Sequence, residues 1–452
     1  MLDDILDVAT AAPWPSPWPS FTQSIDPALV SRLLQSTGTA TVRRRRLPAQ
    51  QVVWLVIAMG LRRDRSMVDV VQQLGLSIET PQGRTAVAAS ATTQARERLG
   101  EEPMRQLFET TGREWMHKGA AQDRWQGLSV YAMDGTKFDV PNSESNEAAF
   151  GRHPTGNGPS ARPLVRMVAL ISARTRIVGA ARIAGYSSSS EVGLARELWD
   201  EVPDSSLVLV DRGFFGASTL WPLTTSGTER HWMTRAKKNL NFTMIEQLAD
   251  ASRIVELRVD DATKKAHPEL PATWRMRAVS YQRKGFEPQT LLTSMLDCVK
   301  YPASMLADLY HERWEVELAF REIKSHQLDA QDVVRSRKAE FVRQELWGML
   351  IAHNLVRLEI ARIAALAKVP PRRVSFIAAL WLILDEWSWS SSPTAAAGAI
   401  PKHLKRLEAN LSSLIQPERR ARSQPRAMLR PDSGWPTKSW VLRKGRKGEQ
   451  GA

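Results

Sequence analysis

Apolar residues recur at helical spacing through the first quarter of the chain. From Asp26 to about residue 119 they return every three or four positions, as in 52–59 and 68–74, and this period is typical of helices packed on one side. Ser66 stands just before the second of these runs and is suited to cap its helix. We therefore expect a helical domain over residues 26–125, preceded over residues 1–25 by an extended lead in which Pro alternates with Trp.

The period changes after Leu128. Runs rich in Val, Ile and Ala that are bounded by Gly, Ser and Pro predict strands, and helical runs alternate with them. This alternation predicts an α/β fold in which helices flank a mixed sheet. The predicted strands are 128–134, 164–173, 176–186, 205–211 and 231–235, and the predicted helices are 190–202 and 217–226, all within a segment over residues 126–236.

A second change of pattern falls at about residue 237. Between 237 and 299 apolar and charged residues alternate, as in 255–260 and 274–278, which indicates antiparallel strands with one face in solvent. We expect a β-rich insertion over these residues. The segments after it are a long helix over Ser304–His326 within residues 300–330, a helical C-terminal region over 331–416 with helices at 339–366 and 373–385, and a basic tail over 417–452.

The charge of the chain favours a polyanionic partner. The chain has 62 Lys and Arg residues against 48 Asp and Glu residues, a net charge of +14, and each cation placed on a phosphate releases condensed counterions. We therefore interpret the N-terminal helices as a DNA-binding domain. Candidate phosphate contacts, for which simple solvation is the alternative, are Arg43, Arg44, Arg45 and Arg46 before these helices, and Lys237 and Lys238 after a predicted strand.

Several classes of protein are excluded by composition and pattern. Cys298 is the only cysteine, so the chain has neither an internal disulfide nor a Cys-rich zinc site. The first residues lack the basic segment and apolar core of a signal peptide. The longest uncharged stretches in the C-terminal helices, 346–356 and 374–384, are too short to cross a bilayer. We expect a cytoplasmic protein with no membrane partner.

Two aspartates stand at the ends of predicted strands. Asp134 is followed by Gly135, and Asp211 closes the apolar run 205–210. Because side chains at the carboxyl ends of neighbouring strands converge at one edge of an α/β sheet, we expect Asp134 and Asp211 to meet there. Asp139, placed mid-strand in the run KFDVP, is the weaker alternative to Asp134. No Gly-x-x-x-x-Gly-Lys-Ser/Thr sequence is present, so these strands do not indicate a P-loop ATPase.

The predicted helix over Ser304–His326 adds a third carboxylate. At about 100° per residue, its functional residues fall on one stripe roughly 80° wide. The residues on this stripe are Tyr310, Arg313, Glu317, Arg321 and Lys324. Glu312, Glu315 and Glu322 fall on the far side, where we expect solvent.

The stripe has two interpretations. Glu317 can simply form salt bridges with Arg313 and Arg321, each four residues away. Alternatively, Asp134, Asp211 and Glu317 together can hold two Mg²⁺ ions about 3.5–4 Å apart for in-line phosphoryl displacement, with the basic side chains of the stripe on DNA phosphates. The cationic chain and the two strand-ending aspartates favour the second interpretation.

These residues resemble the signature of a known family. Tyr310, Arg313, Glu317 and Lys324 are separated by two, three and six residues, a spacing similar to that of the insertion-element-four transposases, a bacterial DDE family. MDGT at 133–136 and DRGF at 211–214 look like the surroundings of that family's first and second aspartates, and residues 37–66 resemble its N-terminal domain. The resemblance covers about residues 25–365.

The resemblance implies a fold and an activity. The fold is an RNase H-like catalytic domain, a mixed five-stranded sheet flanked by helices, with the β-rich insertion placed before the glutamate helix. Asp134, Asp211 and Glu317 would be catalytic and bind two Mg²⁺ ions, for which Mn²⁺ can substitute. An activated water would nick the element end, and the freed 3′-hydroxyl would attack DNA in cut-and-paste transposition, with a hairpin at the element end during excision.

The resemblance also implies how DNA is held. Tyr310, Arg313 and Lys324 would handle DNA near the cut, and Arg321 takes a position that is often basic in the family. An aromatic residue of the insertion often stacks on a flipped base, and Trp232 and Trp274 are the nearest candidates.

The implied partners are the terminal inverted repeats of the element, target DNA and a second copy of the chain, because two element ends must be held together. We expect the protein near the nucleoid in the bacterial cytoplasm. Two alternatives stay open, a catalytically silent DNA-binding descendant and a magnesium-dependent DNA nuclease without strand transfer.

Overall fold

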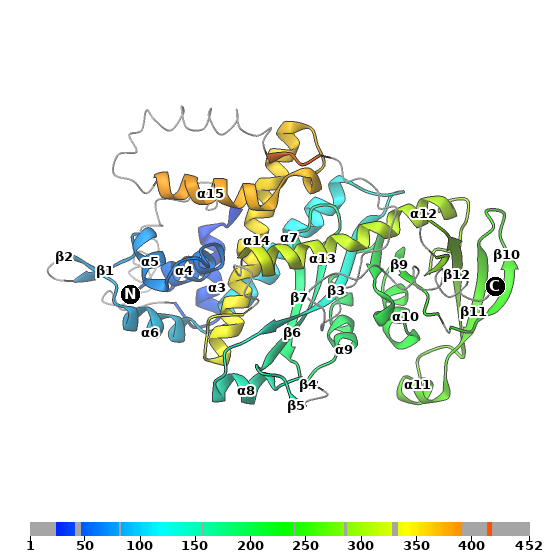
Figure 1. Ribbon diagram of the computed structural model, residues 1–452, viewed down its shortest axis with the longest axis horizontal. Helices are drawn as coiled ribbons and strands as arrows, with labels where there is room; N and C mark the ends of the chain where they lie inside the picture. The colour runs from blue at the N-terminus through cyan, green and yellow to red at the C-terminus, as the bar shows by residue number, and fades with distance from the viewer. Residues whose placement is uncertain are drawn as a thin grey trace, which may run out of the picture.

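A mixed sheet of nine strands extends from the middle of the protein to one end, where β10 and β11 lie (Figure 1). The computed structural model describes residues 24–40, 47–80, 83–155, 158–238, 240–283, 287–327, 333–390 and 414–417. In spatial order the strands are β10 (Thr243–Gln247), β11 (Arg253–Arg258), β12 (Thr273–Tyr281), β13 (Gln289–Thr293), β9 (Arg230–Arg235), β8 (Ser206–Val210), β3 (Ser129–Asp139), β6 (Leu164–Ser172) and β7 (Val178–Gly185). The pairings of β3 with β8 and of β8 with β9 are parallel, and the other pairings in this sheet are antiparallel.

The predicted mixed sheet with flanking helices is confirmed, and its five predicted strands are present within a larger sheet of nine. Strands β7, β6, β3, β8 and β9 form one half of the sheet, close to where the sequence pattern places them. The insertion strands β10 to β13 continue the same sheet, because β13 pairs with β9 and sets Leu291 opposite Arg235. Alternation along a strand shows which of its sides is buried, but it does not show which strand lies next to it.

Helices cover both faces of the sheet (Figure 1). Asp134 of β3 shares a pocket with Glu317 of a helix on one face, whereas Gly135 of β3 lies against Glu191 of a helix on the other. The first face carries α13 (Trp314–Arg321), and α14 (Ala339–Ala367) packs against β7 and the turn after α13. The second face carries α9 (Glu191–Arg196), α10 (Ala217–Thr225) and α7 (Glu102–Gln122), whose Glu109 pairs with Arg182 of β7 on that face. None of the helices in the described ranges combines the length and the apolarity that a membrane crossing requires.

The remaining elements lie outside the central layers. They are α3 (Pro27–Ser36), α4 (Ala49–Leu61), α5 (Met67–Gln73), α6 (Ala89–Leu99), α8 (Glu144–Phe150), α11 (Asp261–Ala266), α12 (Ala303–Leu309), α15 (Phe376–Ser390) and the small hairpins β1 (Ser77–Thr80) with β2 (Gly83–Ala86) and β4 (Pro154–Thr155) with β5 (Gly158–Pro159). The predicted cap at Ser66 is confirmed, because its side chain accepts from the amide of Asp69 at 3.2 Å. The two hairpins were not predicted, since their strands are too short to carry a clear period.

The N-terminal and C-terminal helices share one apolar core. Helix α4 is buried along its whole length and packs against α14. Glycine allows the close approach, because a Cβ on Gly60 would lie 3.0 Å from the Cα of Met349, and a Cβ on Gly348 would lie 2.6 Å from Cγ1 of Val56. Segments from the two ends of the chain are therefore held together beside the sheet.

We expect Gly348→Ala to destabilise the protein by about 1–3 kcal/mol, because the added methyl overpacks against Val56. This loss of stability should appear even though Ala has a higher helix propensity than Gly, by about 1 kcal/mol. Ala365→Gly, on the exposed side of the same helix, is the matched control and should cost about 1 kcal/mol through helix propensity alone. Chemical denaturation measures both, and a Gly348→Ala protein more stable than the wild type would contradict the close packing.

Candidate active site

Parallel pairing of β3 with β8 brings the two predicted aspartates together. The register joins Ser129–Met133 to Ser206–Val210, so Asp134 and Asp211 are the next residues on the two strands. Asp211 directly follows β8, as predicted. Asp134 does not end its strand, because β3 continues to Asp139 in antiparallel pairing with β6. The prediction that a strand ends at Asp134 is therefore wrong, since β6 goes on pairing with β3 beyond the end of β8.

Gly135 contributes to this region through its missing side chain and its backbone amide. A Cβ at this position would lie 2.8 Å from Cδ of Glu191, so glycine permits the close approach of α9. The amide of Gly135 also donates to Oδ1 of Asp134 at 2.8 Å. Asp139 lies five residues further along the strand, on the opposite face from Asp134 because side chains alternate. Asp139 is thus excluded as the partner of Asp211.

The predicted long helix is present as a continuous segment that combines α-helical, 3₁₀ and π-helical turns. It runs through α12, a 3₁₀ turn over Tyr310–Arg313, α13 and a π-helical turn over Glu322–Gln327. Tyr310 is buried, and its hydroxyl donates to the carbonyl of Val210 at 3.2 Å. This bond ties the segment to the residue before Asp211. Burial raises the pKa of Tyr310 to about 12, so the hydroxyl keeps its proton at neutral pH.

Arg313 lies between two of the predicted carboxylates. Its side chain is buried, its Nη2 donates to Oε1 of Glu317 at 2.7 Å, and its Nη1 lies 3.8 Å from Oδ2 of Asp134. The structure thus brings Arg313 together with Asp134 and Glu317, but both Tyr310 and Arg313 are turned to protein partners. As the side chains stand, neither is presented to DNA.

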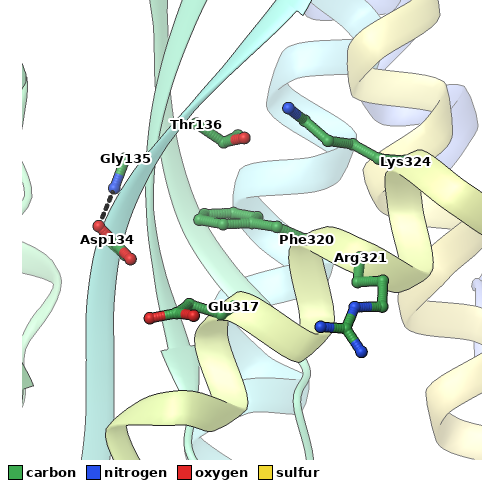
Figure 2. A pocket seen from close by; sticks show the side chains of 7 residues that line it. All are labelled: Asp134, Gly135, Thr136, Glu317, Phe320, Arg321 and Lys324. Atoms are coloured by element: carbon green, nitrogen blue, oxygen red, sulfur yellow. Dashed lines mark hydrogen bonds between the residues drawn. The ribbon is translucent and has the colours of Figure 1, made fainter. Parts of the chain in front are cut away.

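An open pocket of about 340 Å³ lies beside these carboxylates. The residues that line it are Asp134, Gly135, Thr136, Glu317, Phe320, Arg321 and Lys324. In Figure 2 the carboxylates of Asp134 and Glu317 point toward one another, and Lys324 extends toward Thr136. The Nζ of Lys324 lies 5.3 Å from the ring centre of Phe138. The pocket therefore collects acidic and basic groups from β3 and from the helical segment.

Thr136 and Phe320 are pocket residues that the sequence did not single out. Thr136 stands two residues after Asp134, so it faces the same side of β3, and a longer predicted strand would have identified it. Phe320 lies beside the basic stripe of the helix, where its apolar side chain suggested packing alone.

Negative charge accumulates at Asp134. Burial raises the pKa of this carboxyl to about 6, and the charges of Glu317 and Asp211 add to the rise, while the amide of Gly135 and the Arg313 guanidinium oppose it. The charges of both Glu317 and Asp211 therefore act on Asp134, although Asp211 is not part of the pocket lining.

The three carboxylates match Mg²⁺ in kind, because this ion prefers oxygen ligands. In the part of the chain that the structure describes, no three Asp, Glu, His or Cys side chains stand close enough to hold a metal ion as they lie. Arg313 takes the place of a cation between Asp134 and Glu317. Metal binding by these residues therefore requires that the Arg313 guanidinium move away and the carboxylates close in.

The far side of the glutamate segment is not solvated, so that prediction is wrong. Glu322 is only 5% exposed, and Glu315 and Glu312 pair with Arg176 and Arg174. The prediction failed because a helical wheel shows the faces of one helix but not the segments that will cover them. Here α14 and the loop before β7 cover the far side.

Glu322 forms a buried ion cluster with Arg176 and Arg357. Arg176 Nη1 donates to Glu322 at 2.6 Å, and Arg357 Nε donates at 3.0 Å. Burial alone would raise the pKa of Glu322, but the two guanidinium groups hold it below its ordinary value. His353, whose pKa burial lowers to about 4, stays neutral beside them and contacts the carbonyl of Arg176. The cluster fixes the π-helical turn that carries Lys324.

Lys237 and Lys238, two further predicted DNA contacts, are not among the residues that line the pocket. Lys237 and Lys238 are exposed after β9, and Lys238 pairs at the surface with Glu287 at 3.7 Å. The run Arg43 to Arg46 lies outside the described residues.

The two tryptophans suggested for a flipped base are both buried. Their exposures are 0% for Trp232 and 2% for Trp274, and their ring centres lie 5.1 Å apart. Phe215 stacks on Trp274 at 5.5 Å. These rings form an apolar cluster against the sheet, so the suggestion that they stack on a base is wrong for this structure.

Comparisons with known proteins identify the family. Residues 125–355 match the family described as Transposase DDE domain, and residues 16–109 match Insertion element 4 transposase N-terminal. The chain is 34% identical over 424 residues to Transposase InsG for insertion sequence element IS4 of Escherichia coli (strain K12), covering 93% of this chain and 94% of the relative. It is 32% identical over 296 residues to Putative transposase InsZ of the same strain, covering 63% of this chain and 97% of the relative.

A solved structure resembles the chain more distantly. The cryo-EM structure of the piggyBac transposase synaptic complex with hairpin DNA covers 95% of this chain and 89% of its own chain, with 12% identity and a TM-score of 0.44. At that distance it adds nothing to the assignment.

The fold, the grouped carboxylates and the domain match define the class of this protein as a DDE transposase. Within that class the chain belongs to the insertion-element-four family, and it is a bacterial insertion-sequence transposase. The family resemblance drawn from the sequence is confirmed.

In metal-free buffer we expect Asp134→Asn to stabilise the protein above neutral pH. The carboxyl has a pKa of about 6 in the folded protein against 3.8 ordinarily, so its ionised form is disfavoured by folding. This penalty is present in full well above pH 6 and absent below about pH 4. We expect a gain of about 1–3 kcal/mol at about pH 8 that vanishes at about pH 4. Thermal unfolding in EDTA measures it, and a gain that does not shrink as pH falls would contradict the prediction.

Removing one partner of the ion cluster should be costly. We expect Arg357→Met to lower stability by about 3–5 kcal/mol, because Glu322 keeps its charge in a buried site. Arg362→Met breaks an exposed pair with Glu359 on the same helix and should cost less than about 1 kcal/mol. Urea denaturation compares the two variants, and equal losses would show that the cluster is no stronger than a surface pair.

Proposed function

We propose that this transposase cleaves DNA at the ends of its insertion element and joins the freed 3′ ends to target DNA. The observation that supports this most strongly is the pocket in which Asp134 and Glu317 face one another, next to Asp211 and beside Arg321 and Lys324. Acidic groups that can bind a metal and basic groups that can bind phosphate occur there together, which phosphoryl transfer requires.

The catalytic domain in this proposal is RNase H-like. The half-sheet β7-β6-β3-β8-β9, in which β6 alone runs against the others, fits such a fold. Residues 126–236 and 300–330 supply it, and the β-rich insertion over 237–299 interrupts it. Residues 26–125 act as the DNA-binding domain, residues 331–416 form the C-terminal helical region, and the lead and the basic tail flank the fold.

Asp134, Asp211 and Glu317 are the residues that would hold two Mg²⁺ ions, or Mn²⁺ in their place. When bound, the ions would stabilise the charge on the attacking and leaving oxygens. The protein's own side chains position the DNA: Arg321 and Lys324 reach the pocket and suit phosphate oxygens. Tyr310 holds the strand end before Asp211 in place.

The partners in this proposal are the terminal inverted repeats, target DNA and a second copy of the chain. A dimer can hold two element ends for coordinated cutting. Arg313, Lys237, Lys238 and the run Arg43 to Arg46 are further candidate DNA contacts, and Arg313 can serve only after it leaves the carboxylates. The proposed place of action is the nucleoid of the bacterial cytoplasm.

We expect Glu317→Gln to abolish cleavage while DNA binding is retained. The amide keeps the size of the side chain but removes its charge, and a loss of several kcal/mol of transition-state stabilisation lowers the rate at least about a hundredfold. The assay follows nicking in Mg²⁺ of labelled DNA that carries the sequences flanking the gene, with binding measured on the same DNA. Glu144→Gln, at an exposed position, is the control, and normal cleavage by Glu317→Gln would refute the metal role.

Strand transfer separates a transposase from a simple nuclease. We expect the wild-type protein to join a precut labelled element end to a supercoiled plasmid, because a free 3′-hydroxyl replaces water as the nucleophile at the same site. Cleavage without any joined product would favour a nuclease. Binding without either reaction would favour a silent DNA-binding descendant.

A further inference from the structure

The face of β3 turned away from the carboxylate pocket carries a second group of basic residues. Asp134 and Thr136 face the pocket, so Gly135 and Lys137 face the other side of the sheet, toward α9. The residue directly opposite Lys137 on β6 is Arg166. Like charges directly opposite one another on neighbouring strands ordinarily weaken a sheet. The position of Lys137 opposite Arg166 therefore requires an explanation.

Both cations lie over the ring of Tyr186, which follows β7. Lys137 Nζ is 4.8 Å and Arg166 Cζ is 4.3 Å from the ring centre. The ring face attracts cations and offsets part of their repulsion. Tyr186 and Lys137 are half-buried, so the cluster can be reached from solvent.

The positive charge of this cluster is not neutralised. Arg166 is only 8% exposed, donates to Oγ of Ser189 at 3.4 Å, and has no hydrogen-bond partner at Nε. Within the described residues neither Lys137 nor Arg166 forms an ion pair; the Glu191 carboxyl that lies against Gly135 on the same face pairs with neither. A buried guanidinium with an unused donor is costly unless an anion completes its bonding.

We propose that Lys137, Arg166 and Tyr186 form a binding site for a phosphate group of the DNA backbone, distinct from the carboxylate pocket. A guanidinium fork and an ammonium group are the side chains that proteins use for phosphate oxygens. The site lies across the sheet from Asp134, so it holds a stretch of DNA other than the scissile one. It contributes to affinity and not to sequence recognition, because phosphate contacts do not read bases. The inference rests on the proposed action on DNA.

Salt dependence of DNA binding tests the site. The probe is a fluorescein-labelled duplex of arbitrary sequence, titrated with full-length protein in EDTA between about 50 and 300 mM KCl. We expect Lys137→Gln to reduce the slope of log Kobs against log salt by about one, and to weaken binding equally on duplexes of different sequence. Arg166→Gln should have the same effect, and thermal unfolding establishes that each variant is folded.

Lys118→Gln is the matched control, since it removes the same charge from an exposed position on α7. A Lys137→Gln slope equal to the wild-type slope, or changed no more than by Lys118→Gln, overturns the inference while the proposed transposase activity stands. A wild-type protein that shows no salt-dependent binding to any duplex contradicts the proposed function itself.

Discussion

The parallel register between β3 and β8 is the constraint on which the candidate site depends. It sets Asp134 and Asp211 side by side at the point where β8 ends and β3 continues. A slip of one residue would turn Asp134 to the opposite face, toward α9, because side chains alternate. The register is held by the surrounding core, since every residue of β8 and the first five of β3 are buried. A buried pairing that is apolar after its first pair, Ser129 with Ser206, thus positions two carboxylates at its end.

The third carboxylate is fixed by contacts on either side of it. Before Glu317, the Tyr310 hydroxyl joins the helical segment to β8. After it, Glu322 joins the segment to Arg176 and Arg357. Charge burial is weak evidence for stability, because desolvation offsets much of the attraction. The effect of the buried ion cluster here is geometrical. Hydrogen bonds to Glu322 from Arg176 on one side and Arg357 on the other allow one position of the π-helical turn, whereas apolar contacts would allow several.

The sequence predicted those features that depend on local period. The strands of the first half-sheet, the cap at Ser66 and the strand-ending position of Asp211 follow from spacing along the chain. Features that depend on a distant segment were not predicted. The length of β3 depends on its pairing with β6, and the nine-stranded sheet depends on the pairing of β13 with β9. The burial of Glu322 depends on α14. The sequence pattern shows that one face of a helix is polar. Only the fold shows whether that face contacts water or, as at Glu322, arginine side chains.

The partners that the fold supplies also change the interpretation of the stripe that contains Arg313, Arg321 and Lys324. A chain of net charge +14 attracts DNA, yet the pocket at its centre concentrates carboxylates that repel phosphate. The conflict is resolved inside the protein, because Arg313 lies between Asp134 and Glu317 and neutralises part of their charge. Of the stripe, only Arg321 and Lys324 line the pocket as cations. Glu317 supplies a carboxylate of the pocket, and Tyr310 and Arg313 hold the acidic groups in place. A cation that replaced Arg313 there would release its guanidinium for a phosphate beside the pocket.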